Sequence, residues 1–196
     1  RQQLKNEKEI IRDLELLSSQ VERCNQILKK LSLNPNEEDD FIDEDLTIRD
    51  YLKNIISSFK ETSNKDFILN FDQDSNSKKI TKSIEIIYGL RNFIGNAYKY
   101  SLSKIFINLK TDNTFSEITI EDNGEGYPSD ILSKIGEPYL KSPLSKNQKK
   151  AGLGLGIFIG KTLLEKNFAT VVCRNSKTRS GAEIIIKWEN KNLFKI

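Results

Sequence analysis

A basic pair at the start of the last quarter of the chain is followed, after one alanine, by three glycines at alternate positions and then by an apolar segment. Glycine lets the backbone approach a ligand closely and adopt positive φ. If the apolar segment is a helix, its first N–H groups and its partial positive charge face the glycines. This combination predicts a polyphosphate site, formed by Lys149, Lys150, Gly152, Leu153, Gly154, Leu155 and Gly156.

A second polar group lies in an otherwise apolar stretch upstream. Asn92 and Asn96 are four residues apart, and Lys99 follows three residues later, so on a helix all three share one face. Asparagine is locally unfavourable in the middle of a helix. Two of them beside a lysine therefore favour a binding site over an ordinary solvent-facing surface.

A third candidate follows an alternating segment that predicts a strand. Asp122 stands at its end, and Gly124 and Gly126 come next at alternate positions. An acidic side chain at a strand end, followed by glycines, predicts a loop that a ligand can approach closely. A plain Asn-Gly turn stays open as the alternative.

Apolar periodicity predicts the helices that position these groups. Residues 1–32 carry apolar side chains at steps of three and four, as in a coiled coil or helical bundle, with Cys24 on the seam. Pro35 ends this helix and opens an acidic linker. Further helices are expected from Thr47 as cap, over 81–101 with an apolar face that includes Ile84, over 129–135 and over 155–166.

Alternation of apolar and polar residues predicts the strands. Residues 104–110 and 115–121 read as a hairpin, and 66–71, 168–174 and 182–188 as further strands. Residues 140–151 are polar and rich in lysine, which predicts a mobile segment. The expected division is therefore a helical segment at 1–33, a linker at 34–46 and a globular domain at 47–196.

Composition excludes several functions. The net charge of +3, from 31 basic and 28 acidic residues, is too balanced to indicate nucleic-acid binding. The chain has no His, which excludes histidine metal sites, His-dependent triads and phosphorylation of a histidine of its own. Its two cysteines lack metal-binding spacing and are typical of a reducing, cytoplasmic setting.

Two common phosphate-binding motifs fit the glycines poorly. The stretch from Gly156 to Thr162 is one residue too short for a P-loop and reads as apolar helix. A dinucleotide fingerprint from Gly152 would need a third glycine where Ile157 stands, and a lysine-rich loop precedes it where a strand is required.

Taken in order, the polar groups resemble the catalytic ATP-binding domain of sensor histidine kinases. Residues 90–100 are similar to that family's N box, 122–126 to its first glycine box, 136–139 to its F box and 152–156 to its second glycine box. Ser180 to Ala182 resembles the weaker third glycine box. The resemblance covers about residues 47–190.

The resemblance implies the Bergerat fold, which the family shares with gyrase, MutL and related chaperone ATPases. We therefore expect an α/β two-layer sandwich with a mixed, mostly antiparallel sheet covered by helices on one face. Before it, the resemblance implies that residues 1–33 form a long helix from a dimerisation bundle, the second helix of an incomplete dimerisation and phosphoacceptor hairpin. Residues 19–24, 136–139 and 156–165 further resemble the RegB/PrrB-type redox-responsive kinases, in which a cysteine on the dimerisation helices is associated with redox control.

Cys24 is the candidate for that redox position. A small buried residue of the helical seam is the other interpretation, and the sequence leaves both open.

The family also implies roles for single residues. Asp122 would accept a hydrogen bond from the adenine amino group, and Gly124 and Gly126 would let the backbone pass the base. Asn96 would bind Mg²⁺ through its amide oxygen, with Asn92 helping to position the metal or its water. The remaining expected nucleotide contacts are Lys99, Tyr100, Tyr139, Lys149 or Lys150, and the backbone of 152–156.

The implied function is transfer of the ATP γ-phosphoryl group to a histidine on a dimerisation helix absent from this chain, for relay to a response regulator. The chain is then expected to be a homodimerising fragment that binds ATP and Mg²⁺ without phosphorylating itself. The full-length protein is expected to be anchored in the bacterial inner membrane, with this part in the cytoplasm. An inactive regulatory nucleotide-binding module and an ATPase clamp like MutL or gyrase stay open as alternatives.

Overall fold

A computed structural model describes residues 46–60, 65–72, 79–80, 83–138 and 155–194 of the chain. The chain divides into two compact units, Arg1–Asp43 and Glu44–Ile196. The described residues all belong to the second unit. The expected N-terminal helix, with Cys24, lies outside them.

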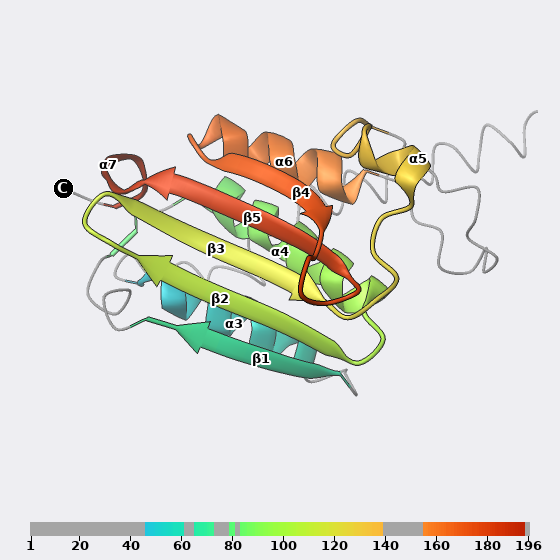
Figure 1. The fold of residues 1–196 in the computed structure, drawn as a ribbon. Coiled ribbons are helices and arrows are strands. Elements are labelled where there is room, and N and C mark those ends of the chain that lie inside the picture. The colour runs from blue at the N-terminus through green and yellow to red at the C-terminus, as the bar shows by residue number, and fades with distance from the viewer. Residues whose placement is uncertain (1–45, 61–64, 73–78, 81–82, 139–154, 195–196) are drawn as a thin grey trace, which may run out of the picture. The chain divides into compact units, whose positions relative to one another are not determined.

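One mixed sheet organises the second unit (Figure 1). Its five strands lie in the order β1-β2-β3-β5-β4. Strand β1 pairs with β2 in parallel, and the other three pairs are antiparallel. The bounds are β1 Asp66–Phe71, β2 Lys104–Thr111, β3 Phe115–Asp122, β4 Thr170–Asn175 and β5 Ala182–Glu189.

Three long helices cover one face of this sheet, and the other face, the open face, is covered by none of the described helices (Figure 1). They are α3 Ile48–Lys60, α4 Ile84–Tyr100 and α6 Gly156–Lys166. Two single turns, α5 Ser129–Leu132 and α7 Asn190–Leu193, complete the described elements. The expected two-layer fold, with a mostly antiparallel sheet and helices on one face, is confirmed.

The core lies between the helices and the covered face of the sheet. Alternate residues of β2, β3 and β5 point inward as expected from their alternating sequence, among them Ile107, Ile118 and Ile186, each fully buried. Trp188 and Phe93 are the largest fully buried side chains. The core therefore fixes β3 and α4, the elements that carry the candidate polar residues, in a rigid layer.

Local capping explains where two helices begin. The Thr47 hydroxyl accepts a hydrogen bond from the Asp50 N–H, and the Asp50 carboxylate accepts one from the Thr47 N–H, which forms a reciprocal cap before α3. The Ser83 hydroxyl accepts from the Ile86 N–H at the start of α4. The expected burial of Ile84 is wrong: it is 42% exposed in the first turn, and Ile86 is buried instead.

Most expected elements agree with the structure to within one to three residues. The exception is α7, which the sequence analysis did not predict. Among the described residues, none of the helices combines the length and the apolar character that crossing a bilayer requires.

Candidate active site

Two glycines bring helix α6 unusually close to helix α4. A Cβ on Gly89 would lie 2.5 Å from the Leu164 Cγ, and a Cβ on Gly160 would lie 3.2 Å from the Gly89 carbonyl oxygen. A side chain at Gly89 would require the Leu164 side chain or helix α6 to shift, and one at Gly160 would make unusually tight contacts with α4. The close crossing places the start of α6 beside the polar residues of α4.

The start of α6 lies against Asn96. A Cβ on Gly156 would be 3.1 Å from the Asn96 Nδ2. That nitrogen is buried and has no hydrogen-bond partner among the described residues. A buried amide without a partner is costly, so it marks a place where a ligand can supply the missing contact.

The backbone N–H groups in the first turn of α6 also donate no capping hydrogen bond to any described side chain. Leu155 stands at the cap position, in a helical conformation, and no side chain caps the helix there. The first N–H groups of a helix have no partner within the helix and attract anions. Gly156 and Leu155, two of the expected phosphate contacts, are thus placed where they could bind a phosphate.

The other expected residues of α4 are Asn92, Lys99 and Tyr100, and their contacts differ from those of Asn96. Asn92 donates from Nδ2 to the Tyr88 carbonyl oxygen at 2.9 Å. The Lys99 ammonium lies 5.0 Å from the centre of the Tyr100 ring, and Tyr100 is 56% exposed. Lys99 and Tyr100 therefore stand at the outer end of α4, and Asn96 lies one turn further in, beside α6.

Asp122 ends β3 as a buried acid, only 2% exposed. Its Oδ1 accepts hydrogen bonds from the Gly124 N–H at 2.7 Å and from the Ala182 N–H at 3.4 Å. Burial raises the pKa of Asp122 above its ordinary value of 3.8, and these hydrogen bonds and the charge of Lys65 oppose that rise. The second oxygen, Oδ2, takes part in none of the hydrogen bonds found within the described ranges, so it can accept one from a ligand.

The glycines around Asp122 are required by close backbone contacts. A Cβ on Gly124 would lie 2.4 Å from the Tyr100 carbonyl oxygen, and one on Gly181 would lie 2.0 Å from the Asp122 carbonyl oxygen. The loop after β3 therefore touches the end of α4, and the start of β5 packs directly on Asp122. Gly126 has φ +75°, a conformation that favours glycine.

Asn123 fixes the same loop to the strand beside it. Its Oδ1 accepts hydrogen bonds from the N–H groups of Leu102, Ser103 and Lys104 at 2.9 to 3.2 Å. Sequence reasoning assigned Asn123 no role, and neither did it recognise Gly89 or Gly160. The two glycines can be read from the sequence, but their role depends on how α4 and α6 pack against each other.

The structure thus brings together Asn96, Leu155 and Gly156 at one place, and Asp122, Gly124, Gly126 and the end of α4 at another. The two groups are joined by α4 itself. Seven expected residues lie outside the described part of the chain: Cys24, Tyr139, Lys149, Lys150, Gly152, Leu153 and Gly154.

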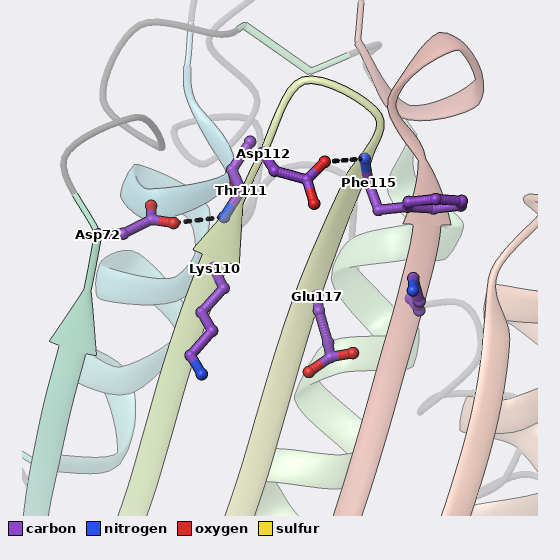
Figure 2. Close-up of a pocket in the computed structure, with 7 residues that line it drawn as sticks. Asp72, Lys110, Thr111, Asp112, Phe115 and Glu117 are labelled. Carbon is purple, nitrogen blue, oxygen red and sulfur yellow. Dashed lines mark hydrogen bonds between the residues drawn. The ribbon is translucent and has the colours of Figure 1, made fainter.

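Another depression lies elsewhere on the domain. A hollow of about 450 Å³ on the open face of the sheet is lined by Asp72, Lys110, Thr111, Asp112, Phe115, Glu117 and Lys187. Figure 2 draws these residues as sticks. The hollow surrounds the start of β3, whereas Asp122 ends that strand. Lys110, Glu117 and Lys187 are register partners across three strands, so their alternating charges suit the sheet itself.

Comparisons with known proteins agree with the arrangement. Residues 81–192 match the family described as histidine kinase-, DNA gyrase B-, and HSP90-like ATPase. The sensor histidine kinase RegB of Cereibacter sphaeroides is 30% identical over an alignment of 172 residues, which covers 84% of this chain and 37% of that protein. The sensor histidine kinase CpxA of Escherichia coli K12 is 27% identical over 97 residues, covering 50% of this chain and 21% of CpxA.

Solved structures show the same fold. The mycobacterial sensor histidine kinase MprB aligns with a TM-score of 0.59 at 18% identity, covering 74% of this chain and 96% of that one. Full-length ShkA in complex with AMPPNP aligns with a TM-score of 0.61 at 18% identity, covering 78% of this chain and 31% of ShkA. The chain thus spans little more than a third of the length of RegB.

Proposed function

The chain belongs to the histidine kinase-, DNA gyrase B- and HSP90-like ATPases, and we propose that it is the ATP-binding catalytic part of a two-component sensor histidine kinase. It would transfer the γ-phosphoryl group of ATP to a histidine on a dimerisation helix, for relay to a response regulator. The observation that carries the proposal is the uncapped start of α6 beside the unpartnered amide of Asn96. The similarity to RegB supports the choice of the kinase branch.

Asp122 is the candidate group for recognising adenine. The residue is buried, and its Oδ2 makes no hydrogen bond among the described residues, which suits an exocyclic amino group that donates hydrogen bonds. Gly124 and Gly126 would allow the base to lie against the backbone of the loop. The ATP analogue named with ShkA is consistent with an adenine nucleotide in this fold.

Asn96 is the candidate for the metal and phosphate end of the site. Its amide is buried and unsatisfied on the side that faces Gly156. The two ends of an amide are assigned and not observed, so the same position can offer a donor to phosphate or an oxygen to a cation. Mg²⁺ keeps several waters and binds substrate phosphates, so a single amide oxygen fits it. When bound, the ion would neutralise phosphate charge.

The remaining contacts are proposals of the same kind. Lys99 and Tyr100, at the outer end of α4, would approach phosphate oxygens. Lys149 or Lys150 and the backbone of 152–154 would complete the phosphate contacts, and Tyr139 would lie near the nucleotide. Phosphoryl transfer depends mainly on positioning and charge neutralisation, which these groups supply.

Transfer to a protein is preferred over hydrolysis because of the side chains on α4. The candidate face carries Asn92 and Asn96, and an amide cannot act as a base toward water. Asn92 is moreover engaged with the Tyr88 carbonyl oxygen. A MutL-like or gyrase-like ATPase clamp would need a base at this face, so it is the less favoured function.

The acceptor histidine must come from another segment, because the chain contains no His. We propose that residues 1–33 are one helix of a dimerisation hairpin, that 34–46 link it to the catalytic domain at 47–196, and that the protein is a homodimer. Cys24 on this helix would then be a candidate redox-responsive thiol. A cytoplasmic location, with an inner-membrane anchor elsewhere in the full-length protein, completes the proposal.

The test is a reconstitution. The chain is mixed with a separately produced dimerisation domain that carries the acceptor histidine, together with Mg²⁺ and ATP labelled at the γ-phosphate. Label on the histidine is the expected result. ATP binding without labelling would instead identify a regulatory nucleotide-binding module, and steady phosphate release without an acceptor would identify an ATPase clamp.

A further inference from the structure

The loop that follows Asp122 is held at its far end by a side chain from a distant strand. Asn175, the last residue of β4, accepts a hydrogen bond at Oδ1 from the Tyr127 N–H, at 2.6 Å. Its Nδ2 donates to the Tyr127 carbonyl oxygen at 2.9 Å. One amide thus satisfies both backbone groups of Tyr127, as a neighbouring strand would.

The same contact restricts which residue can stand before Tyr127. Gly126 has φ +75°, and a Cβ there would lie 2.7 Å from the Asn175 Oδ1. Asn175 therefore occupies the space that any other residue at 126 would need. The second glycine of the loop serves both the turn and the approach of this amide.

Asn175 is itself fixed to the strand that packs on Asp122. It is the register partner of Ala182 in β5, and the Ala182 N–H donates to the Asp122 Oδ1 at 3.4 Å. The Ser176 N–H donates to the Gly181 carbonyl oxygen at 2.9 Å just beyond this pair. The end of the β4–β5 pair thus holds the loop at Asp122 and again at Tyr127.

We propose that Asn175 is a positioning residue for the adenine site. It holds Gly126 and Tyr127 so that the loop wall stays in the conformation that receives the base. The inference rests on the proposed ATP-binding function. Asn175 is exposed and belongs to no part of the core, so its amide serves the loop and not the stability of the sheet.

Removing the amide should loosen the loop and leave the fold intact. The backbone groups of Tyr127 can then turn to water, and the loop can adopt other conformations. If about one tenth of the molecules keep the competent conformation, the apparent affinity for the base falls about tenfold. The phosphate end of the site, at Asn96 and α6, is unaffected.

The experiment compares the 196-residue chain with Asn175→Ala and with Thr170→Ala, an exposed residue at the other end of the same strand. Titration calorimetry measures the affinity for ATP with Mg²⁺, and NMR measures amide hydrogen exchange without nucleotide. Asn175→Ala should bind ATP about tenfold more weakly, with faster exchange at Tyr127 and unchanged exchange in β2 and β3. Thr170→Ala should match the unmodified chain.

Two results would overturn the inference while the proposed function stands. One is an ATP affinity of Asn175→Ala equal to that of the unmodified chain. The other is a weaker affinity accompanied by faster exchange throughout β2 and β3, which would mean general destabilisation. An unmodified chain that binds no ATP would overturn the proposed function, and this inference with it.

Discussion

Replacing Asp122 by asparagine should separate nucleotide binding from stability. Asp122 is a buried acid whose pKa burial raises above its ordinary value, so its charge costs the folded state free energy at neutral pH. Asparagine has the same shape and keeps an oxygen at the position of Oδ1. That oxygen can still accept from the Gly124 and Ala182 N–H groups.

The two effects have opposite signs. With the charge removed and both hydrogen bonds kept, the free energy of unfolding at pH 7 should stay unchanged or rise by about 0.5–2 kcal/mol, the usual range of stabilising substitutions. In the proposed site, the bond that Oδ2 would offer to the adenine amino group is charge-assisted, and asparagine would place an amide N–H there instead. Loss of such a bond costs about 1.5–3 kcal/mol, so ATP affinity should fall roughly 10- to 150-fold.

The stability effect has a defined pH dependence. A carboxyl whose pKa is raised on folding binds its proton more tightly in the folded state, so its contribution to stability is present at low pH. That contribution is lost as the pH rises from about 3.8, the ordinary value, through the raised one. The advantage of Asp122→Asn should therefore be largest at neutral pH and shrink as the solution is acidified.

Urea denaturation from pH 4 to pH 7 and ATP titration at pH 7 measure the two effects. Glu125→Gln is the matched control, because it removes an exposed carboxylate from the same loop. It should change neither quantity appreciably. An Asp122→Asn variant that is clearly less stable than the unmodified chain at pH 7, or that binds ATP equally well, would refute these roles of Asp122.

Three further substitutions test the packing around the site. Gly181→Ala places a Cβ 2.0 Å from the Asp122 carbonyl oxygen, so the backbone must move. The free energy of unfolding, measured by urea denaturation, should fall by about 1–3 kcal/mol. An unchanged value would contradict the close contact. Gly89→Ala places a methyl group against Leu164 and pushes α6 away from α4. The cost of overpacking exceeds the gain in helix propensity, so the free energy of unfolding should fall by about 1 kcal/mol. A rise would show that Leu164 repacks freely. Phe168→Asn relieves the backbone strain of φ 62° at a residue that is 72% exposed. The free energy of unfolding, measured by thermal unfolding, should rise by about 1 kcal/mol. A fall would mean that the phenyl ring contributes to the fold.

Local chemistry made most of the fold predictable. The hairpin of β2 and β3 follows from strict alternation of apolar and polar residues, because one face of the sheet is buried and the other is open. The cap at Thr47 follows from its hydroxyl and the acid three residues later. The buried face of α4 was wrong only in its first turn, where Ile84 lies beyond the end of the core.

The candidate site was predictable in its residue types and less so in its contacts. Glycines and asparagines at regular spacing indicate a binding site because both residue types are unfavourable within ordinary helices and strands. The bond from Asn175 to Tyr127, 48 residues apart, has no local signal. The same holds for Gly181 on Asp122 and for Gly89 at the helix crossing, since each depends on how distant segments pack.

We propose that ATP binds between the start of α6 and Asp122. Titrating the isotopically labelled chain with ATP and Mg²⁺, and following its amide NMR signals, tests this most directly. The largest shifts are expected at Asn96, Gly124 and Gly156, with none in the hollow on the open face (Figure 2). Shifts concentrated at Lys110 and Glu117, or no shifts at all, would contradict the account.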